Sequence, residues 1–179
     1  MPGLTPYTPE IDNPYPDEWR EITGFRIDTP TKVMRPKPPD PSLNRPYRAQ
    51  YYTTCDYVVS CHIDGEWRTI RAPSGMLTDL ATIPFPVSLF VRRKGKHLPA
   101  ALIHDYLSIA WQDVVIEGAP RGARERDFHF SNQVLREALL ALDYPRWLVR
   151  IVVWAAGGGW ARRRYDAENN DPRYVKVGD

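Results

Sequence analysis

The hydrophobic pattern of this chain changes its period once, near Pro86. Upstream, over residues 51–63, apolar and polar residues largely alternate, which is the period of a β-strand with one buried face. Downstream, apolar residues recur every three or four positions, which is the period of an amphipathic helix. Because the two periods occupy separate parts of the chain, the sequence predicts an α+β fold in which strands precede helices.

A β-hairpin is expected over residues 50–72. One face of its first strand carries apolar or small residues at Tyr51, Cys55, Tyr57, Val59, Cys61 and Ile63. Asp64 and Gly65 then supply a two-residue turn of the kind that joins antiparallel strands, and residues 66–70 return as the second strand. The sequence therefore predicts a hairpin or small antiparallel sheet with one face toward a core.

Three helices are expected after the strands, over residues 99–112, 123–142 and 145–162. Pro99 suits the first turn of a helix. The second helix has an apolar face made of Phe130, Val134, Leu135, Ala138, Leu139 and Leu142. Glycines at 157–159 favour close packing or a helix end. The expected architecture is a small antiparallel sheet packed on a three-helix unit.

Most of the 18 prolines lie in the first 46 residues. Proline removes a backbone donor and restricts the residue before it to extended geometry, so these stretches cannot form helices or central strands. We therefore predict an extended, proline-rich arm over residues 1–46, in which only residues 20–28 could form a strand. A globular domain is expected over residues 47–165, followed by a polar tail over residues 166–179.

The composition excludes several classes of protein. A formal net charge of +2 gives no reason to expect a specific nucleic-acid partner. Cys55 and Cys61 provide no disulfide framework and, with His62, no metal-site spacing. The acidic, proline-rich start lacks the apolar region of a signal peptide, and no apolar run is long enough to span a bilayer. We expect a protein without a transmembrane segment that is made in the cytoplasm.

Three stretches carry a resemblance to a known family: "IRAPSGMLTDLATIP", "AALIHDYLS" and "ARERDFHFSNQVLREALLALDYPRW". In this order they resemble the phage and prophage family catalogued as domain of unknown function 1353, over roughly residues 50–162. Its members carry a threonine-aspartate loop, a histidine-aspartate helix and a later helix with an aspartate. This chain departs from the family pattern at Met76, Thr82, Ser108 and Arg126. The resemblance implies a phage origin, but the family name gives no mechanism.

The histidine-aspartate helix is also similar to that of phospholipase A2 enzymes. There, the histidine is a general base, the next aspartate binds calcium, and an aspartate on a facing helix orients the imidazole. The matching residues here are His104, Asp105 and Asp127. This resemblance implies an alternative function, a small phage hydrolase related to phospholipase A2 or to lysis, with calcium bound at Asp105.

A structural interpretation of the same residues is favoured over catalysis. Buried ionisable groups need partners, and a polar network could hold the loop at residues 73–84 against the helices. We expect Asp105 or Asp127 to bond to His104 or to the backbone of that loop. The predicted network consists of Asp79, His104, Asp105, Arg124 and Asp127. This interpretation requires no metal and no cofactor.

The predicted function is that of a virion-associated structural or assembly protein of a tailed phage, in the tail, the neck or the capsid. Its proline-rich arm would bind neighbouring virion proteins in a multi-copy assembly, because such a segment cannot bury a core of its own. The expected contact residues are Tyr7, Tyr15, Trp19 and Tyr47. The protein would be made in the host cytoplasm and then enter the virion. The hydrolase remains the alternative.

Overall fold

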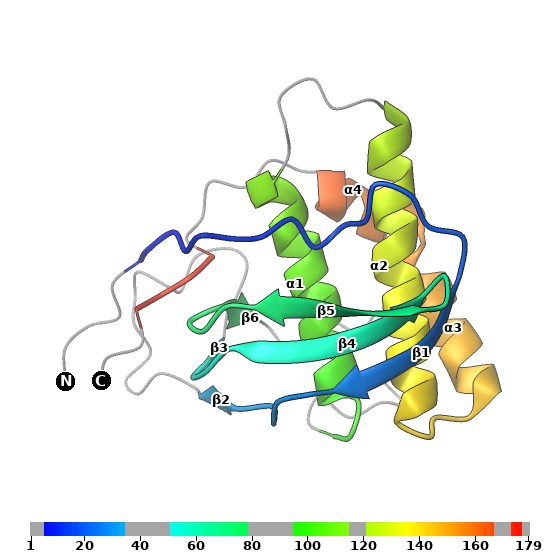
Figure 1. Ribbon diagram of the computed structural model, residues 1–179, viewed down its shortest axis with the longest axis horizontal. Coiled ribbons are helices and arrows are strands. Elements are labelled where there is room, and N and C mark those ends of the chain that lie inside the picture. Colours follow the sequence, from blue (N-terminus) through cyan, green and yellow to red (C-terminus); the bar gives the residue numbers. More distant parts are fainter. Residues whose placement is uncertain (1–5, 35–50, 79–94, 115–120, 167–172, 177–179) are drawn as a thin grey trace.

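The computed structural model describes residues 6–34, 51–78, 95–114, 121–166 and 173–176, and the predicted α+β fold is confirmed (Figure 1). Two antiparallel sheets are present, with strand orders β1-β4-β5 and β2-β3-β6. The strands are β1 (Ile22–Ile27), β2 (Val33–Met34), β3 (Tyr51–Thr53), β4 (Tyr57–Ile63), β5 (Glu66–Ala72) and β6 (Leu77–Thr78).

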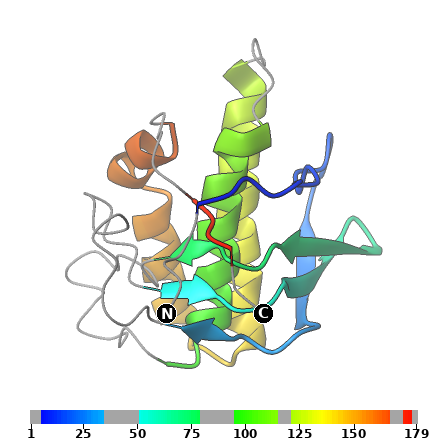
Figure 2. The ribbon, with the colours of Figure 1, turned by 90° about the vertical axis from the view of Figure 1, so that its left-hand side faces the viewer.

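The helices are α1 (Leu98–Val114), α2 (Arg121–Ala141), α3 (Arg146–Ala156) and α4 (Gly159–Asp166). Figures 1 and 2 show three layers: the β1-β4-β5 sheet covers one side of α1 and α2, while α3 and α4 lie on the other side. Helices α1 and α2 therefore form the middle of the domain. Within the described part of the chain, no helix combines the length and the apolarity needed to cross a membrane.

The predicted hairpin is present as the pair β4 and β5, but the strand expected from Tyr51 to Ile63 is divided into β3 and β4, which belong to different sheets. Asp64 and Gly65 have φ angles of 50° and 91°, as a two-residue turn between right-twisted strands requires. The inward face of β4 is fully buried, at Tyr57, Val59, Cys61 and Ile63. Burial raises the pKa of the Cys61 thiol to about 12, so this cysteine is a neutral core residue.

The first two helices agree with the prediction, and the third differs from it. The predicted inward residues of α2 are buried, apart from a half-buried Leu142. The segment expected as one helix over residues 145–162 is two helices, because α3 ends at a capping glycine, Gly157, whose N–H donates to the Val153 carbonyl. Glycine costs more backbone entropy in a helix than other residues, which favours an end at this point.

In the described part of the arm predicted over residues 1–46, the strand expected within residues 20–28 is present as β1, but the segment is not separate from the core. Strand β1 pairs with β4 at the edge of the larger sheet, and Tyr15, Ile22 and Phe25 belong to the hydrophobic core. Proline forbids helices and central strands, but it does not prevent an extended segment from packing its side chains. The core therefore includes the N-terminal segment.

The two ends of the described chain pair with each other, and the C-terminal one also pairs with the loop around Gly75. Tyr7 N–H donates to the Tyr174 carbonyl (3.2 Å), and Val175 N–H donates to the Gly75 carbonyl (2.9 Å). Tyr174 and Val175 are buried, so this part of the predicted polar tail is also built into the fold. Figure 1 shows the two terminal segments side by side, near β6.

Candidate functional site

His104 of α1 faces α2, where its partner is an amide. The imidazole Nε2 lies 3.3 Å from Oδ1 of Asn132, and Nδ2 of Asn132 donates to the Phe128 carbonyl at 3.0 Å. Because the Asn132 amide nitrogen donates to that carbonyl, the amide oxygen is the atom that accepts a hydrogen bond from His104. This network assigns the proton to Nε2 of the imidazole and the lone pair to Nδ1.

The charge state of His104 follows from its surroundings. Burial lowers the pKa of the imidazole, and the bond to Asn132 opposes this effect only in part. His104 is therefore neutral near pH 7. A neutral imidazole held by an uncharged amide is compatible with a structural contact and also with a general base acting through Nδ1.

Asp105, the next residue of α1, is bound by the loop predicted at residues 73–84, which we call the motif loop and of which the structure describes residues 73–78. The hydroxyl of Thr78 in β6 donates to Oδ2 of Asp105 at 2.6 Å, and Thr78 is itself buried. This bond connects the loop predicted at residues 73–84 to the histidine-aspartate helix, as the polar-network hypothesis expects. The donor is a side-chain hydroxyl, whereas the prediction named the loop backbone.

Asp127 does not occupy the place expected for it beside the imidazole. It is buried on α2, where burial raises the pKa of its carboxyl, and its bond is with Nε of the neighbouring Arg126 (3.4 Å). Asn132 lies five residues further along, about 140° around the helix, so the two side chains point in different directions. Asn132 takes the place predicted for Asp127 opposite His104.

Asn132 lies within the quoted stretch at residues 123–147, but only charged residues of that stretch were predicted as members of the site. It stands four residues after Phe128 and three before Leu135, on the apolar face of α2. A buried amide on such a face requires a partner, which is the signal that could have identified it. Of the other predicted network residues, Asp79 lies outside the described residues, and Arg124 lies in the first turn of α2.

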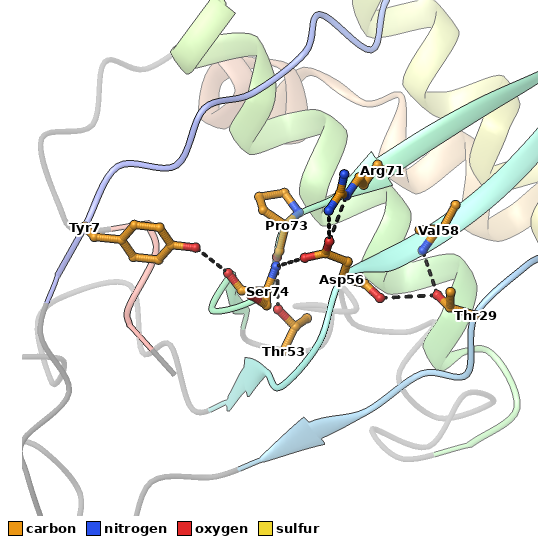
Figure 3. A network of polar contacts seen from close by, with 8 residues as sticks. All are labelled: Tyr7, Thr29, Thr53, Asp56, Val58, Arg71, Pro73 and Ser74. Atoms are coloured by element: carbon orange, nitrogen blue, oxygen red, sulfur yellow. Dashed lines mark hydrogen bonds and ion pairs between the residues drawn. The ribbon is translucent and has the colours of Figure 1, made fainter. Parts of the chain in front are cut away.

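Figure 3 shows a second polar cluster, centred on Asp56 between β3 and β4. Its carboxylate accepts from Nε of Arg71 (2.7 Å) and from the backbone N–H of Ser74 (2.9 Å). Tyr7 donates its hydroxyl to the Ser74 carbonyl (2.9 Å), and Thr53 donates to the Pro73 carbonyl (3.2 Å). The cluster thus fixes the start of the motif loop and ties the N-terminal segment to it.

The Asp56 cluster also includes the segment after β1. Thr29 donates its hydroxyl to the Asp56 carbonyl (3.3 Å) and accepts from Val58 N–H (2.8 Å). Burial opposes ionisation of Asp56, but the bonds from Arg71 and Ser74 outweigh it and hold the pKa of its carboxyl below the usual range. No motif predicted this cluster, because its members come from distant parts of the sequence.

The predicted partner-binding residues make contacts within the chain. Tyr15 is buried and donates its hydroxyl to the Leu107 carbonyl of α1, so it is not available to a partner. The Trp19 ring stacks on His129, with ring centroids 5.4 Å apart. Tyr7 is held by the Asp56 cluster, and Tyr47 lies outside the described residues. Partner binding by Tyr7 and Trp19 stays a prediction.

Helix α3 exposes apolar side chains along its outer side. Trp147, Ile151 and Trp154 are 54%, 37% and 79% exposed and lie at the i, i+4, i+7 spacing of one helix face. We call these three residues the aromatic face of α3. Leu148 and Val149 are buried on the side toward the core. Helix α3 is therefore apolar on both sides, which an ordinary surface helix is not.

A pocket of about 450 Å³ lies between α2 and the start of β1. We call it the α2 pocket; it is lined by Trp19, Arg20, Glu21, Ile22, Thr23, His129, Gln133, Arg136, Glu137 and Leu140. Glu137 is buried beside the guanidinium of Arg136, and burial raises the pKa of its carboxyl. Nε1 of Trp19 is buried without a hydrogen-bond partner.

Metal binding finds no support in the described ranges, which contain no group of three or more histidine, cysteine, aspartate or glutamate side chains that could hold an ion. Asp79 lies outside these ranges.

Comparison with known proteins identifies one family. The family described as "Protein of unknown function (DUF1353)" matches residues 56–156, from the start of the hairpin to the end of α3. No curated protein and no solved structure matches the chain. The matched region contains His104, Asp105, Asn132 and the aromatic face of α3. Because the match covers more than half of the 179 residues, this chain belongs to the DUF1353 family.

Proposed function

We propose that this protein is a virion-associated assembly component of a bacteriophage, which binds a neighbouring protein subunit through the aromatic face of α3. The proposal keeps the assembly role expected from the sequence and replaces the arm as the contact surface. The aromatic face is the single observation that carries it.

Large exposed apolar side chains are concentrated on this helix. Among the described residues, six large hydrophobic side chains are exposed, and three of them form the aromatic face. The other three, Ile27, Met34 and Trp67, lie on strands. Single exposed apolar residues are common on protein surfaces, whereas an apolar patch marks a binding site. Tryptophan, two of the three residues here, is the type most enriched at the centres of protein interfaces.

The contacts of His104 and Asp105 support a binding protein over an enzyme. The imidazole pairs with the neutral Asn132 amide, and the carboxylate accepts from the Thr78 hydroxyl. Both bonds join separate elements of the fold, as structural bonds do. The resemblance of the three sequence motifs to a phage and prophage family supports the virion as the place of assembly.

The test compares alanine variants of three exposed tryptophans. We expect Trp147→Ala and Trp154→Ala to reduce incorporation into assembled particles, because each removes part of the aromatic face. Trp67→Ala, at a tryptophan of similar exposure (52%) on the sheet, is the control and should assemble normally. Thermal melts of all three should stay close to the wild type. Normal incorporation of both α3 variants would contradict the proposal.

A second candidate function, a small hydrolase, is favoured by one specific observation. Because His104 donates from Nε2 to Asn132, its Nδ1 carries the lone pair and is the atom that would take a proton from an attacking water. Asp105 would then be the calcium-binding residue. The purified protein should, in that case, hydrolyse phospholipid or cell-wall substrates, and His104→Gln should remove the activity without lowering the melting temperature.

A further inference from the structure

We infer that the neighbouring subunit is a second copy of this chain, and that copies associate head to tail. The aromatic face of α3 in one copy docks on the α2 pocket and the adjoining acidic segment of the next. This inference rests on the proposed function, because it identifies the partner of the same helix.

The charges of α3 have one sign. Arg146 and Arg150 are exposed beside the aromatic face, and the helix contains no acidic residue. Neither arginine takes part in an ion pair within the described part of the chain, although five other pairs are formed there. The partner surface that complements α3 is therefore apolar at its centre and acidic around it.

The N-terminal segment over residues 10–21 has this charge. Its exposed acidic residues are Glu10, Asp12, Asp17, Glu18 and Glu21, against a single arginine. Asp17 and Glu18 form no ion pair among the described residues. Both precede Trp19, the first residue that lines the α2 pocket. Unpaired carboxylates thus stand beside the pocket, as unpaired guanidinium groups stand beside the aromatic face.

The α2 pocket has the properties of a receptor for a large side chain. Its volume of about 450 Å³ lies in the range of small-ligand sites. Its lining is mostly polar, and its apolar part consists of Trp19, which stacks on His129, together with Ile22 and Leu140. Trp154, at 79% exposed, is the most exposed of the large hydrophobic side chains and fits the role of the inserted group.

The placement of the two surfaces makes the contact intermolecular. Figures 1 and 2 show the N-terminal segment on the sheet side of α2 and α3 on the opposite side. The surfaces therefore cannot meet within one molecule, and their repeated pairing produces a ring or an open chain of copies. A two-fold pairing of α3 with itself would instead place Arg146 and Arg150 of both copies together without a carboxylate from either helix.

The test is sedimentation velocity of the full chain at increasing protein concentration. We expect self-association that weakens as salt is raised, because exposed charges are screened over about 10 Å at 0.1 M salt. Trp154→Ala should weaken association by about tenfold or more, as expected for a central interface residue. The double variant Asp17→Lys/Glu18→Lys should also weaken it, because it places lysines opposite Arg146 and Arg150. Trp67→Ala is the matched control and should associate like the wild type. Unchanged melts would show that all variants fold.

Mixing the two defective variants separates head-to-tail docking from other arrangements. Each variant keeps one intact surface, so the mixture should form one-to-one dimers although neither variant associates alone. If only Trp154→Ala affected association, the contact would be α3 with α3, and the inference would be wrong. It would also be overturned if the wild type bound vesicles of phosphatidylcholine and phosphatidylglycerol through Trp154 and remained monomeric without them.

The particle assay distinguishes this inference from the proposed function. A wild type that stays monomeric at every concentration, together with reduced particle incorporation of Trp154→Ala, would overturn self-docking and leave assembly through α3 intact. Normal particle incorporation of Trp154→Ala would instead contradict the proposed function itself.

Discussion

The bond between His104 and Asn132 is the point at which the structural and catalytic interpretations make opposite predictions. Asn132 is 5% exposed, so His104→Ala leaves a buried amide oxygen without its donor. A buried polar group left unsatisfied costs about 1–3 kcal/mol, and the lost contacts of a half-buried ring add to this. We therefore expect His104→Ala to lower the free energy of unfolding by about 2–3 kcal/mol.

A double-mutant cycle isolates the bond itself. Asn132→Ala should lower the free energy of unfolding by a similar amount, because it leaves Nε2–H of His104 without an acceptor and removes the bond to the Phe128 carbonyl. The double variant should lose about 1 kcal/mol less than the sum of the two single variants, which is the net value of one hydrogen bond. Urea unfolding with constant m-values gives all three free energies.

The control for this cycle is Ser108→Ala. Among the described residues, the Ser108 hydroxyl bonds to the carbonyl of His104, one turn earlier on the same helix. Such a bond contributes little to a helix, so its loss should change the unfolding free energy by no more than about 0.5 kcal/mol. Strictly additive single variants would refute the structural interpretation. So would an unchanged unfolding free energy together with loss of a hydrolytic activity.

The same histidine gives stability a defined dependence on pH. Burial lowers the pKa of His104 in the folded chain below its unfolded value of about 6.5, so the unfolded state takes up the proton first. Stability is therefore complete above that value and falls as pH drops below it. His97 shifts in the same direction, again because of burial. Below pH 6.5, we expect His104→Ala to reduce the slope of unfolding free energy against pH. His97 should account for part of the slope that remains in this variant.

Two further predictions concern the loop that both chain ends contact. Gly75 has φ +80°, and a Cβ there would lie 1.9 Å from the Val175 carbonyl oxygen; Gly65 has φ +91° with no atom within 4 Å. Both alanine variants should lose about 1–3 kcal/mol from backbone strain, but only Gly75→Ala should also release the C-terminal segment to protease. Asp56→Asn should cost about 1 kcal/mol at pH 7, because it removes the charged bonds to Arg71 and Ser74. The lowered pKa of Asp56 contributes stability above about pH 4. The unfolding free energies of the wild type and Asp56→Asn should therefore become equal as pH falls below that value. Equal unfolding free energies at pH 7 would contradict this account of the cluster.

The elements that the sequence predicted best are those whose side chains repeat. The alternation from Tyr57 to Ile63 marks β4, and the helical spacing from Phe130 to Leu139 marks α2, because each period records which side of the element is buried. The extended N-terminal segment has no such period. Its buried residues, Tyr15, Ile22 and Phe25, are spaced seven and three positions apart and follow an irregular path that only the tertiary fold defines.

The candidate site was predicted in part, for a similar reason. Motif residues indicated that Asp105 and the loop before α1 belong together, and Thr78 provides that connection. The partner of His104 depends on the relative rotation of α1 and α2, which a sequence does not specify; a turn of about 140° separates Asn132 from Asp127. The Asp56 cluster joins residues as far apart as Tyr7 and Ser74, beyond any local pattern.

Burial of the N-terminal segment changes how this protein can bind a partner. A disordered arm would lose conformational entropy on docking, which lowers its affinity for a given contact area. Here Tyr15 is fixed in the core, and Tyr7 is held by Ser74. The acidic residues of the segment over residues 10–21 therefore lie on a segment that is already ordered. Helix α3 is likewise anchored through Leu148 and Val149 while its aromatic face stays exposed. Two ordered surfaces of complementary charge bind with a smaller ordering cost, so contact between them requires fewer new interactions than an arm would.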